Sequence, residues 1–495
     1  MRLNYDKFKS MALNHEVVPV YQAVLADLIT PIGAYLRLQN TATHCFLFES
    51  VIKGNRSRYS FLGRNPSKIF TYSKGVTTIQ KSNEEPINVD GNFLDILREE
   101  KSKFQVAPLD GYPNFTGGFV GYMGYETVNF FEDIPVHLSS HENGIEIPDS
   151  IFMKMDDLMV FDHSKNQAIV FTNVRIESKD EAYLKNLFEQ AHAKIDQFGM
   201  SLHLDIEYQL PIKSQRSKMS SNTTQSTFVE SVHKAKNAIQ EGDIFQLVLS
   251  QKFHRKTLAD GCSIYRALRT INPSPYMFHI KFSKFEIMGA SPEVLVKVED
   301  NEMEVRPIAG TRKRGKSDEE DQRLAQDLLN DEKELAEHLM LVDLGRNDVG
   351  KVSQFSSVKV PEYMQIEKYS HVMHIVSQVK GTLKPSVDVW DALFAGFPAG
   401  TTSGAPKIKA MQLINQLEPC RRGIYSGAVG YLDGRNELNT CIAIRTLWKK
   451  GPDVYFQAGA GIVHDSDPIK EYEETVNKAQ AIMQAIDLAE DGLVS

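Results

Sequence analysis

Short apolar runs of strand length fill the first two hundred residues and recur later, and this pattern does most to limit how the chain can fold. Before residue 208, few long helical patterns interrupt the runs, which lie at His44–Phe48, Lys68–Tyr72, Gly117–Tyr122, Ser150–Phe161 and Ala168–Val174. After residue 227, the runs are mixed with helical patterns and lie at Phe245–Phe253, Tyr276–Lys281, Val294–Val298, Gly427–Tyr431, Thr440–Leu447 and Val454–Ala458. This mixture favours an α+β fold, a layered β-sandwich with flanking helices.

A polar stretch separates the two sheet-rich parts. Residues 208–226 are rich in Ser and Thr and poor in large apolar side chains, which is typical of a linker or a long surface loop. A helical pattern, Phe228–Glu241, follows it. The sequence therefore predicts an N-terminal region, 1–207, and a C-terminal region, 227–495, whose sheet-rich halves could pack together as one sandwich.

The overall composition excludes several classes of protein. Of the 495 residues, 42% are hydrophobic, and the formal net charge of −8 disfavours a nucleic acid or an anionic membrane as partner. No apolar run reaches membrane-spanning length, and the N-terminal residues lack the apolar core of a signal peptide. The four cysteines are scattered without metal-ligand spacing, as in a reducing compartment. We therefore expect a cytoplasmic protein.

Two helical patterns near the C-terminal end each carry two glutamates three residues apart. Residues with this spacing share one face of a helix. If the two faces meet, four carboxylates converge and suit a partly hydrated Mg²⁺ that holds an anionic substrate. The alternative is that both pairs lie on ordinary solvated helix faces. The patterns are Asp318–Leu344, with Glu334 and Glu337, and Pro468–Ile486, with Glu471 and Glu474.

Two glycine-bearing segments could also hold a ligand. Phe397–Lys407 offers backbone amides and hydroxyls that lead into a helix, which suits a carboxylate, but it lacks the adjacent Gly-Lys-Ser/Thr of a nucleotide-binding loop. An ordinary turn with a helix cap explains this segment equally well. Gly459, Ala460 and Gly461 follow a strand-like run, and their small size lets a ligand approach the backbone.

Several longer motifs, taken together and in their order along the chain, resemble the chorismate-binding enzymes. The motifs are Gln246–Ser250, Ser291–Glu293, Pro307–Thr311, Glu337–Asp343, Arg346–Asp348, Phe397–Lys407 and Glu471–Lys478. The resemblance covers residues 225–485 almost without gaps and implies the fold of the chorismate-utilising enzymes. Chorismate is a cyclohexadiene with two carboxylates, a C4 hydroxyl group and an enolpyruvyl ether.

The resemblance implies a role for each matching residue. The four glutamates would hold Mg²⁺, which in turn holds the ring carboxylate. Glu293 matches the general acid that protonates the departing C4 hydroxyl group, and His374 matches the histidine of the later pyruvate elimination. Tyr425 and Arg445 match the groups that bind the enolpyruvyl carboxylate. The catalytic set also includes Gln246 and Thr311, and the remaining substrate-positioning residues are Ile308, Ala309, Gly310, Thr401, Gly459, Ala460, Gly461 and Lys478.

Two positions distinguish the branches of this family. Members that form isochorismate or salicylate carry a water-activating lysine at the position of Gln246, and a glutamine cannot act as that base. Typical aminodeoxychorismate synthases carry a nucleophilic lysine at the position of Ala309, so that here ammonia itself would attack C2 of the ring. Both positions imply the anthranilate synthase branch, whose large component converts chorismate and ammonia to anthranilate and pyruvate in tryptophan biosynthesis. The alternative is aminodeoxychorismate synthase component I.

The resemblance also implies a partner and a regulator. The sequence shows no Cys–His glutaminase constellation, so ammonia from glutamine would require a separate glutamine amidotransferase chain, the second component of the enzyme. Two segments are similar to those that line the tryptophan pocket of this branch, which implies feedback inhibition by tryptophan. An ordinary strand end and turn would be the alternative. The residues concerned are Glu49, Ser50, Arg58, Tyr59, Ser60, Pro275, Tyr276 and Met277.

Overall fold

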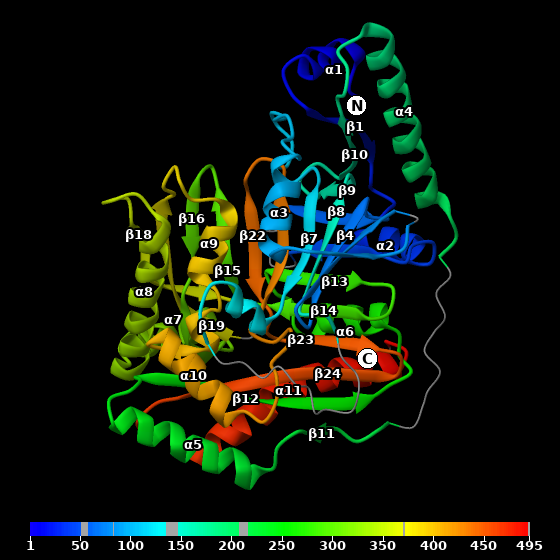
Figure 1. Cartoon of the computed structure of the whole chain (residues 1–495). Helices are drawn as coiled ribbons and strands as arrows, with labels where there is room; N and C mark the ends of the chain where they lie inside the picture. The colour runs from blue at the N-terminus through cyan, green and yellow to red at the C-terminus, as the bar shows by residue number, and fades with distance from the viewer. Residues whose placement is uncertain (51–57, 83, 135–146, 207–215, 370–371, 494–495) are drawn as a thin grey trace.

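Two large antiparallel sheets form the body of the molecule in a computed structural model (Figure 1), which confirms the predicted layered α+β class. The structure describes residues 1–50, 58–82, 84–134, 147–206, 216–369 and 372–493. Helices flank the sheets, with α1 and α4 packed together near the N-terminus and α5 and α11 at the opposite end (Figure 1). Within the described residues, no helix is both long enough and apolar enough to cross a membrane.

The first sheet, sheet A, carries strands from both ends of the sequence. In spatial order its strands are β1 (Val17–Leu25), β10 (Gln167–Arg175), β9 (Asp157–Asp162), β3 (Tyr59–Arg64), β2 (Cys45–Glu49), β13 (Tyr276–Lys281), β14 (Glu286–Ser291), β23 (Thr446–Lys450), β24 (Asp453–Ile462), β12 (Gln246–Lys256) and β11 (Ser220–Ser221), with β20 (Gly404–Ala405) beside β12.

The second sheet, sheet B, is built in the same mixed way. Its strands are β17 (Ile308–Lys313), β19 (Val372–Thr382), β16 (Glu302–Val305), β15 (Val294–Glu299), β22 (Leu438–Ile442), β21 (Ala428–Asp433), β7 (Gly118–Met123), β8 (Ser150–Met155), β4 (Lys68–Ser73), β5 (Val76–Lys81) and β6 (Ile87–Val89), with β18 (Lys359–Lys368) beside β19.

The helices lie on the outer faces and at the ends of the two sheets. The α-helices are α1 (Tyr5–Ala12), α2 (Pro31–Gln39), α3 (Phe93–Ser102), α4 (Glu181–Met200), α5 (Gln225–Gln240), α6 (Gly261–Ile271), α7 (Asp318–Leu329), α8 (Glu332–Val352), α9 (Val389–Gly396), α10 (Lys407–Leu417) and α11 (Pro468–Glu490). Short 3₁₀ turns occur at η2 (Tyr125–Phe130), η3 (Ser201–His203) and η4 (Gly400–Thr402).

Each sheet contains strands from before and from after the polar stretch at 208–226. In sheet A, β2 pairs with β13, so that Leu47 lies opposite His279. In sheet B, β7 pairs with β21, so that Gly121 lies opposite Gly430. Residues 207–215 lie outside the described residues, and β11 lies in the part that follows them. The division into two regions stays a prediction, because the two halves share their sheets.

Most predicted elements are found, but three of them are split. The helical segment Asp318–Leu344 consists of α7 and α8, because the Asp331 side chain accepts the backbone N–H groups of Lys333 and Glu334 and starts a new helix. The run Ser150–Phe161 forms β8 and β9. The run Thr440–Leu447 also forms two strands, because Arg445, at φ +49°, turns the chain between β22 and β23.

Candidate active site

Glu293 is a buried carboxyl group at the junction of β14 and β15. Only 8% of the residue is exposed, and its Oε1 accepts a hydrogen bond of 3.1 Å from the Thr401 hydroxyl group. Burial raises its pKa to about 8, although the Thr401 hydrogen bond and the charge of Arg445 act in the opposite direction. Glu293 therefore carries a proton at neutral pH and can donate it.

Arg445 lies close to this acid, and the Tyr425 hydroxyl group lies beside Gly459 on β24. Arg445 follows β22, and its charge is near enough to influence the pKa of Glu293. Its Nη1 donates to Oδ1 of Asn272 at 3.3 Å. Burial raises the pKa of Tyr425 to about 12, so its hydroxyl group stays protonated. The Arg445 cation near a protonated acid and the Tyr425 hydroxyl donor are groups that can bind an anionic substrate.

The glycines of β24 make room for two neighbouring side chains. A Cβ atom at Gly459 would lie 2.6 Å from the Tyr425 hydroxyl oxygen, and one at Gly461 would lie 2.8 Å from Nε2 of Gln246. Gln246, the first residue of β12, is buried and donates from Nε2 to Glu337 at 3.3 Å. Between the two glycines, Ala460 is fully buried. Close approach of a ligand to this backbone stays a prediction.

His374 on β19 lies opposite Thr311 on β17. Its Nδ1 is 2.9 Å from the Gly310 carbonyl oxygen and 3.1 Å from the Thr311 hydroxyl oxygen. A carbonyl oxygen can only accept, so Nδ1 carries the proton. Burial lowers the pKa of His374, which leaves Nε2 as the unprotonated nitrogen at neutral pH. A bulge between Ala309 and Thr311, with Gly310 at φ +67°, places that carbonyl group.

Ile308 and Ala309, which precede the bulge, begin β17 and are half-buried and buried. The other predicted substrate contact, Lys478 on α11, donates to the Gly459 carbonyl oxygen at 3.0 Å and pairs with Glu474 at 2.7 Å. It therefore connects α11 to β24 beside Tyr425.

The four predicted metal ligands lie on α8 and α11 and influence one another. Burial and the charges of Glu334 and Glu474 raise the pKa of Glu337. Burial and the charge of Glu474 also raise the pKa of Glu471. Carboxylates held in mutual repulsion fit a divalent cation, which would relieve that repulsion.

The same carboxylates are also held by cations of the chain. Glu334 pairs with Arg312 at 3.3 Å, and Glu474 pairs with Lys478. Among the residues that the structure describes, no three His, Cys, Asp or Glu side chains gather closely enough to hold a metal ion together. The electrostatic influence of Glu474 on Glu337 and on Glu471 relates the two helices, but the convergence of the four glutamates on Mg²⁺ stays a prediction.

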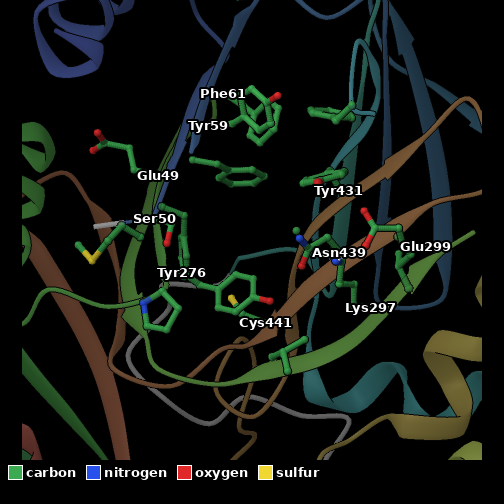
Figure 2. Close-up of a pocket in the computed structure, with 18 of the residues that line it drawn as sticks. Glu49, Ser50, Tyr59, Phe61, Tyr276, Lys297, Glu299, Tyr431, Asn439 and Cys441 are labelled. Carbon is green, nitrogen blue, oxygen red and sulfur yellow. Dashed lines mark hydrogen bonds and ion pairs between the residues drawn. The ribbon is translucent and has the colours of Figure 1, made fainter. Parts of the chain in front are cut away.

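A cavity of about 540 Å³ lies between the two sheets. Figure 2 shows Glu49, Ser50 and Tyr276 on one side and Tyr431, Asn439 and Lys297 on the other. Seven of the eight residues predicted to bind tryptophan line it, namely Glu49, Ser50, Arg58, Tyr59, Pro275, Tyr276 and Met277. Ser60 is not among the lining residues, because it lies between Tyr59 and Phe61 on β3 and points to the other face of the strand, where its hydroxyl group bonds to Nε2 of His163 at 2.8 Å. Residues 51–57 of this segment lie outside the described residues.

The polar groups of this cavity are partly engaged already. The Glu49 carboxylate is 6% exposed, accepts the Tyr265 hydroxyl group at 2.7 Å and pairs with Arg269 at 3.2 Å. Arg58 pairs with Asp162 at 2.9 Å. The buried Ser50 hydroxyl group has no hydrogen-bond partner in the described part of the chain.

Sequence reasoning missed a buried ion pair next to the predicted site. Arg422 and Glu418 lie 2.6 Å apart, with side chains 1% and 4% exposed. Their spacing of four residues was the available signal in the sequence. Only the structure shows that Arg422 in this segment contacts the Thr401 loop, through the Thr402 carbonyl oxygen.

Comparison with known proteins agrees with this geometry. The family model described as "chorismate binding enzyme" matches residues 43–484. Anthranilate synthase component 1 of Acetivibrio thermocellus is 43% identical over 488 residues, covering 98% of both chains. The protein of the same name from Synechocystis is 45% identical over 503 residues, covering 97% of this chain and 98% of the relative.

Solved structures show the same fold. Anthranilate synthase component I of Streptococcus pneumoniae superposes with a TM-score of 0.76 at 36% identity, covering 93% of this chain and 98% of that one. The menaquinone-specific isochorismate synthase of Escherichia coli has a TM-score of 0.69 at 18% identity, covering 97% and 98%, and supports the fold alone. The chain therefore belongs to the chorismate-binding enzyme family, within the group of anthranilate synthase component I.

Proposed function

We propose that this chain is the catalytic large component of anthranilate synthase, which converts chorismate and ammonia to anthranilate, pyruvate and water. The observation that carries the proposal is the buried, protonated Glu293, bonded to Thr401 and close to Arg445. Such a group can protonate the departing C4 hydroxyl group, which leaves as water when ammonia attacks C2. Arg445 and Tyr425 are suited to hold the enolpyruvyl carboxylate while this happens.

His374 is suited to the second half of the reaction. After ammonia has added, the ring becomes aromatic when the proton at C2 is removed and the enolpyruvyl group leaves from C3 as pyruvate. Nδ1 of His374 is fixed by the Gly310 carbonyl group, so the unprotonated Nε2 is the nitrogen that can take this proton. Thr311 helps to orient the ring of the histidine.

Two neutral residues restrict the reaction to ammonia. Gln246 is buried and hydrogen-bonded to Glu337, so its amide cannot activate water as a base. Ala309 offers no nucleophile for a covalent adduct at C2. Both residues therefore favour attack by ammonia itself, and they disfavour isochorismate formation and the aminodeoxychorismate alternative.

Mg²⁺ belongs to this proposal. Glu334, Glu337, Glu471 and Glu474 would hold it, and it would supply positive charge to the ring carboxylate of chorismate. Burial and the charge of Glu474 raise the pKa values of both Glu337 and Glu471, which supports a cation in this region.

Glutamine would serve only through a partner subunit. All four cysteines are buried, and burial raises the pKa values of Cys45 and Cys441 to about 12, so these thiols are poor nucleophiles. The chain therefore needs a glutamine amidotransferase, the second component, or a high concentration of free ammonia. The four buried cysteines form no disulfide with one another, which also supports a reducing, cytoplasmic location.

Tryptophan is the proposed inhibitor of the enzyme, and the cavity between the sheets is its proposed binding site. The carboxylate of Glu49 suits its ammonium group, the unpartnered Ser50 hydroxyl group can bond to it, and Met277 provides an apolar wall. Because β2 and β13 come from the two halves of the chain, a ligand here contacts both halves and can couple to the active site.

One assay tests the proposal. Purified chain is incubated with chorismate, Mg²⁺ and an ammonium salt at alkaline pH, and the products are identified by mass. Anthranilate and pyruvate are expected, and replacing ammonium by glutamine should stop the reaction. Release of aminodeoxychorismate, which retains the enolpyruvyl group, would instead support the alternative branch.

A further inference from the structure

A fully buried arginine, Arg422, connects segments that carry the proposed substrate contacts. Its side chain is 1% exposed. Nη1 donates to the Thr402 carbonyl oxygen at 2.7 Å, and Nη2 donates to the Val248 carbonyl oxygen at 2.8 Å. Thr402 directly follows Thr401, which holds the acid, and Val248 lies two residues after Gln246 on β12. One guanidinium group therefore connects the Thr401 loop to the strand that carries Gln246.

Glu418 fixes the orientation of this guanidinium group. Its Oε2 accepts from Nε of Arg422 at 2.9 Å, and its Oε1 accepts from Nη2 at 2.6 Å, which is a two-bond carboxylate pairing. The same Oε1 accepts the backbone N–H and the hydroxyl group of Ser250 at 2.8 and 2.7 Å. Both members of the pair therefore bond to β12: Arg422 through Val248, and Glu418 through Ser250.

Tyr425 also lies beside Arg422. The guanidinium carbon of Arg422 lies 5.5 Å from the centre of the Tyr425 ring. The backbone N–H of Arg422 donates to Glu126 at 2.8 Å, which holds the turn that leads to Tyr425. Just beyond, the hydroxyl groups of Ser426 and Thr402 bond at 2.5 Å, so the turn and the Thr401 loop are also connected directly.

We propose that Arg422 is a positioning residue, which sets the distances between Thr401, Gln246 and Tyr425 that the chorismate reaction requires. This inference rests on the proposed function. Arg422 makes no contact that would place it on a reacting atom; it acts through the carbonyl groups of Thr402 and Val248. A lysine would keep the charge but has no planar fork, so it could not make both carbonyl contacts and the two-bond pairing with Glu418.

Arg255 provides a matched control. It lies on β12, the strand to which Arg422 bonds, its side chain is likewise 1% exposed, and it pairs with Asp487 and Glu490 at 2.6 Å each. These partners lie at the end of α11, and none of the bonds reaches a proposed substrate contact. If buried arginine pairs only stabilise the fold, Arg422→Lys and Arg255→Lys should have equal effects on the enzyme.

The experiment compares wild type, Arg422→Lys and Arg255→Lys below their thermal midpoints. The measurements are kcat and KM for chorismate with ammonium, and the pH profile of kcat. Because misplacing catalytic groups by about 1 Å can lower rates by roughly 10²-fold, kcat/KM of Arg422→Lys should fall by about that factor. Its profile should also shift to higher pH, because a loosened Thr401 no longer lowers the pKa of Glu293. Arg255→Lys should retain the parent kinetics and profile.

Parent kinetics and an unmoved profile in Arg422→Lys would overturn the inference, and so would equal losses in both variants. If Arg422→Lys does not fold, the double variant Arg422→Met with Glu418→Leu replaces the ion pair by apolar side chains of similar size, an exchange that proteins often tolerate. The same kinetic loss is then expected, and parent kinetics would again refute positioning. An inactive wild type would contradict the proposed function, whereas an active wild type with an unimpaired variant contradicts this inference alone.

Discussion

Replacing Glu293 by glutamine is expected to inactivate the enzyme and to stabilise it near neutral pH. The residue is 8% exposed, and burial raises its pKa to about 8, whereas a glutamate in an unfolded chain titrates near about 4.3. Between these two values the unfolded chain releases a proton that the folded protein keeps. The stability that the protonated group provides is full below the unfolded pKa and is lost as the pH rises through the folded pKa.

The magnitude follows from these two pKa values. Within this window, each pH unit lowers the free energy of unfolding of the wild type by about 1.4 kcal/mol. From about pH 5 to about pH 8 the loss is on the order of 4 kcal/mol. A glutamine at position 293 does not titrate and can still accept the Thr401 hydrogen bond. The difference in free energy of unfolding should therefore grow in favour of Glu293→Gln by this amount over the same pH range.

Urea unfolding of both proteins, followed by tryptophan fluorescence at several pH values, measures this difference. In parallel, turnover of chorismate with ammonium should fall by roughly 10²-fold or more in Glu293→Gln, while chorismate still binds. A difference in stability that does not change with pH would mean that Glu293 is ionised in the folded protein, and its role as general acid would be refuted. Glu437→Gln is the control, because burial raises the pKa of Glu437 to about 7 and Glu437 is not among the proposed chorismate contacts, so stability should respond without loss of turnover.

Three further substitutions test other parts of the site. Glu337→Gln should abolish turnover and weaken Mg²⁺ binding measured by calorimetry without unfolding the protein; near-parental turnover would remove Glu337 from the metal set. Ser50→Phe should fill the tryptophan cavity, so that initial rates no longer respond to tryptophan while basal kcat is retained, and unchanged inhibition would place the inhibitor elsewhere. Gly459→Ala would put a Cβ 2.6 Å from the Tyr425 hydroxyl oxygen. This clash should lower the free energy of unfolding by about 1–3 kcal/mol and raise KM for chorismate. A parental KM would contradict the role of Tyr425 as a substrate contact.

The fold class was predictable because strand-length runs dominate the sequence, and β13 begins and ends at the predicted residues Tyr276 and Lys281. The break between α7 and α8 was not predicted, because the acidic and apolar pattern continues through Asn330 and Asp331. Only backbone geometry shows that the Asp331 side chain satisfies the first N–H groups of a new helix.

The motifs name the residues of the candidate site, because they identify chemistry without giving distances. The structure adds the protonated state of Glu293 and the tautomer of His374, whereas the roles of these residues and of Tyr425 stay predictions. The pairing of Arg422 with Glu418 could not be predicted, since burial of an ion pair depends on segments far apart in the sequence. Likewise, sequence alone could not show that the glycines of β24 accommodate Tyr425 and Gln246.

The sharing of both sheets by distant segments has a consequence for how this chain is made. During synthesis the N-terminal half leaves the ribosome first, with the edges of β2 and β7 still unpaired. Leu47 on β2 can pair only after His279 on β13 has been translated. Gly121 on β7 can pair only later, after Gly430 on β21 has been translated. Exposed strand edges invite pairing with other chains, and non-local contacts form slowly. Nascent chains should therefore depend on chaperones, and an N-terminal fragment expressed alone should aggregate.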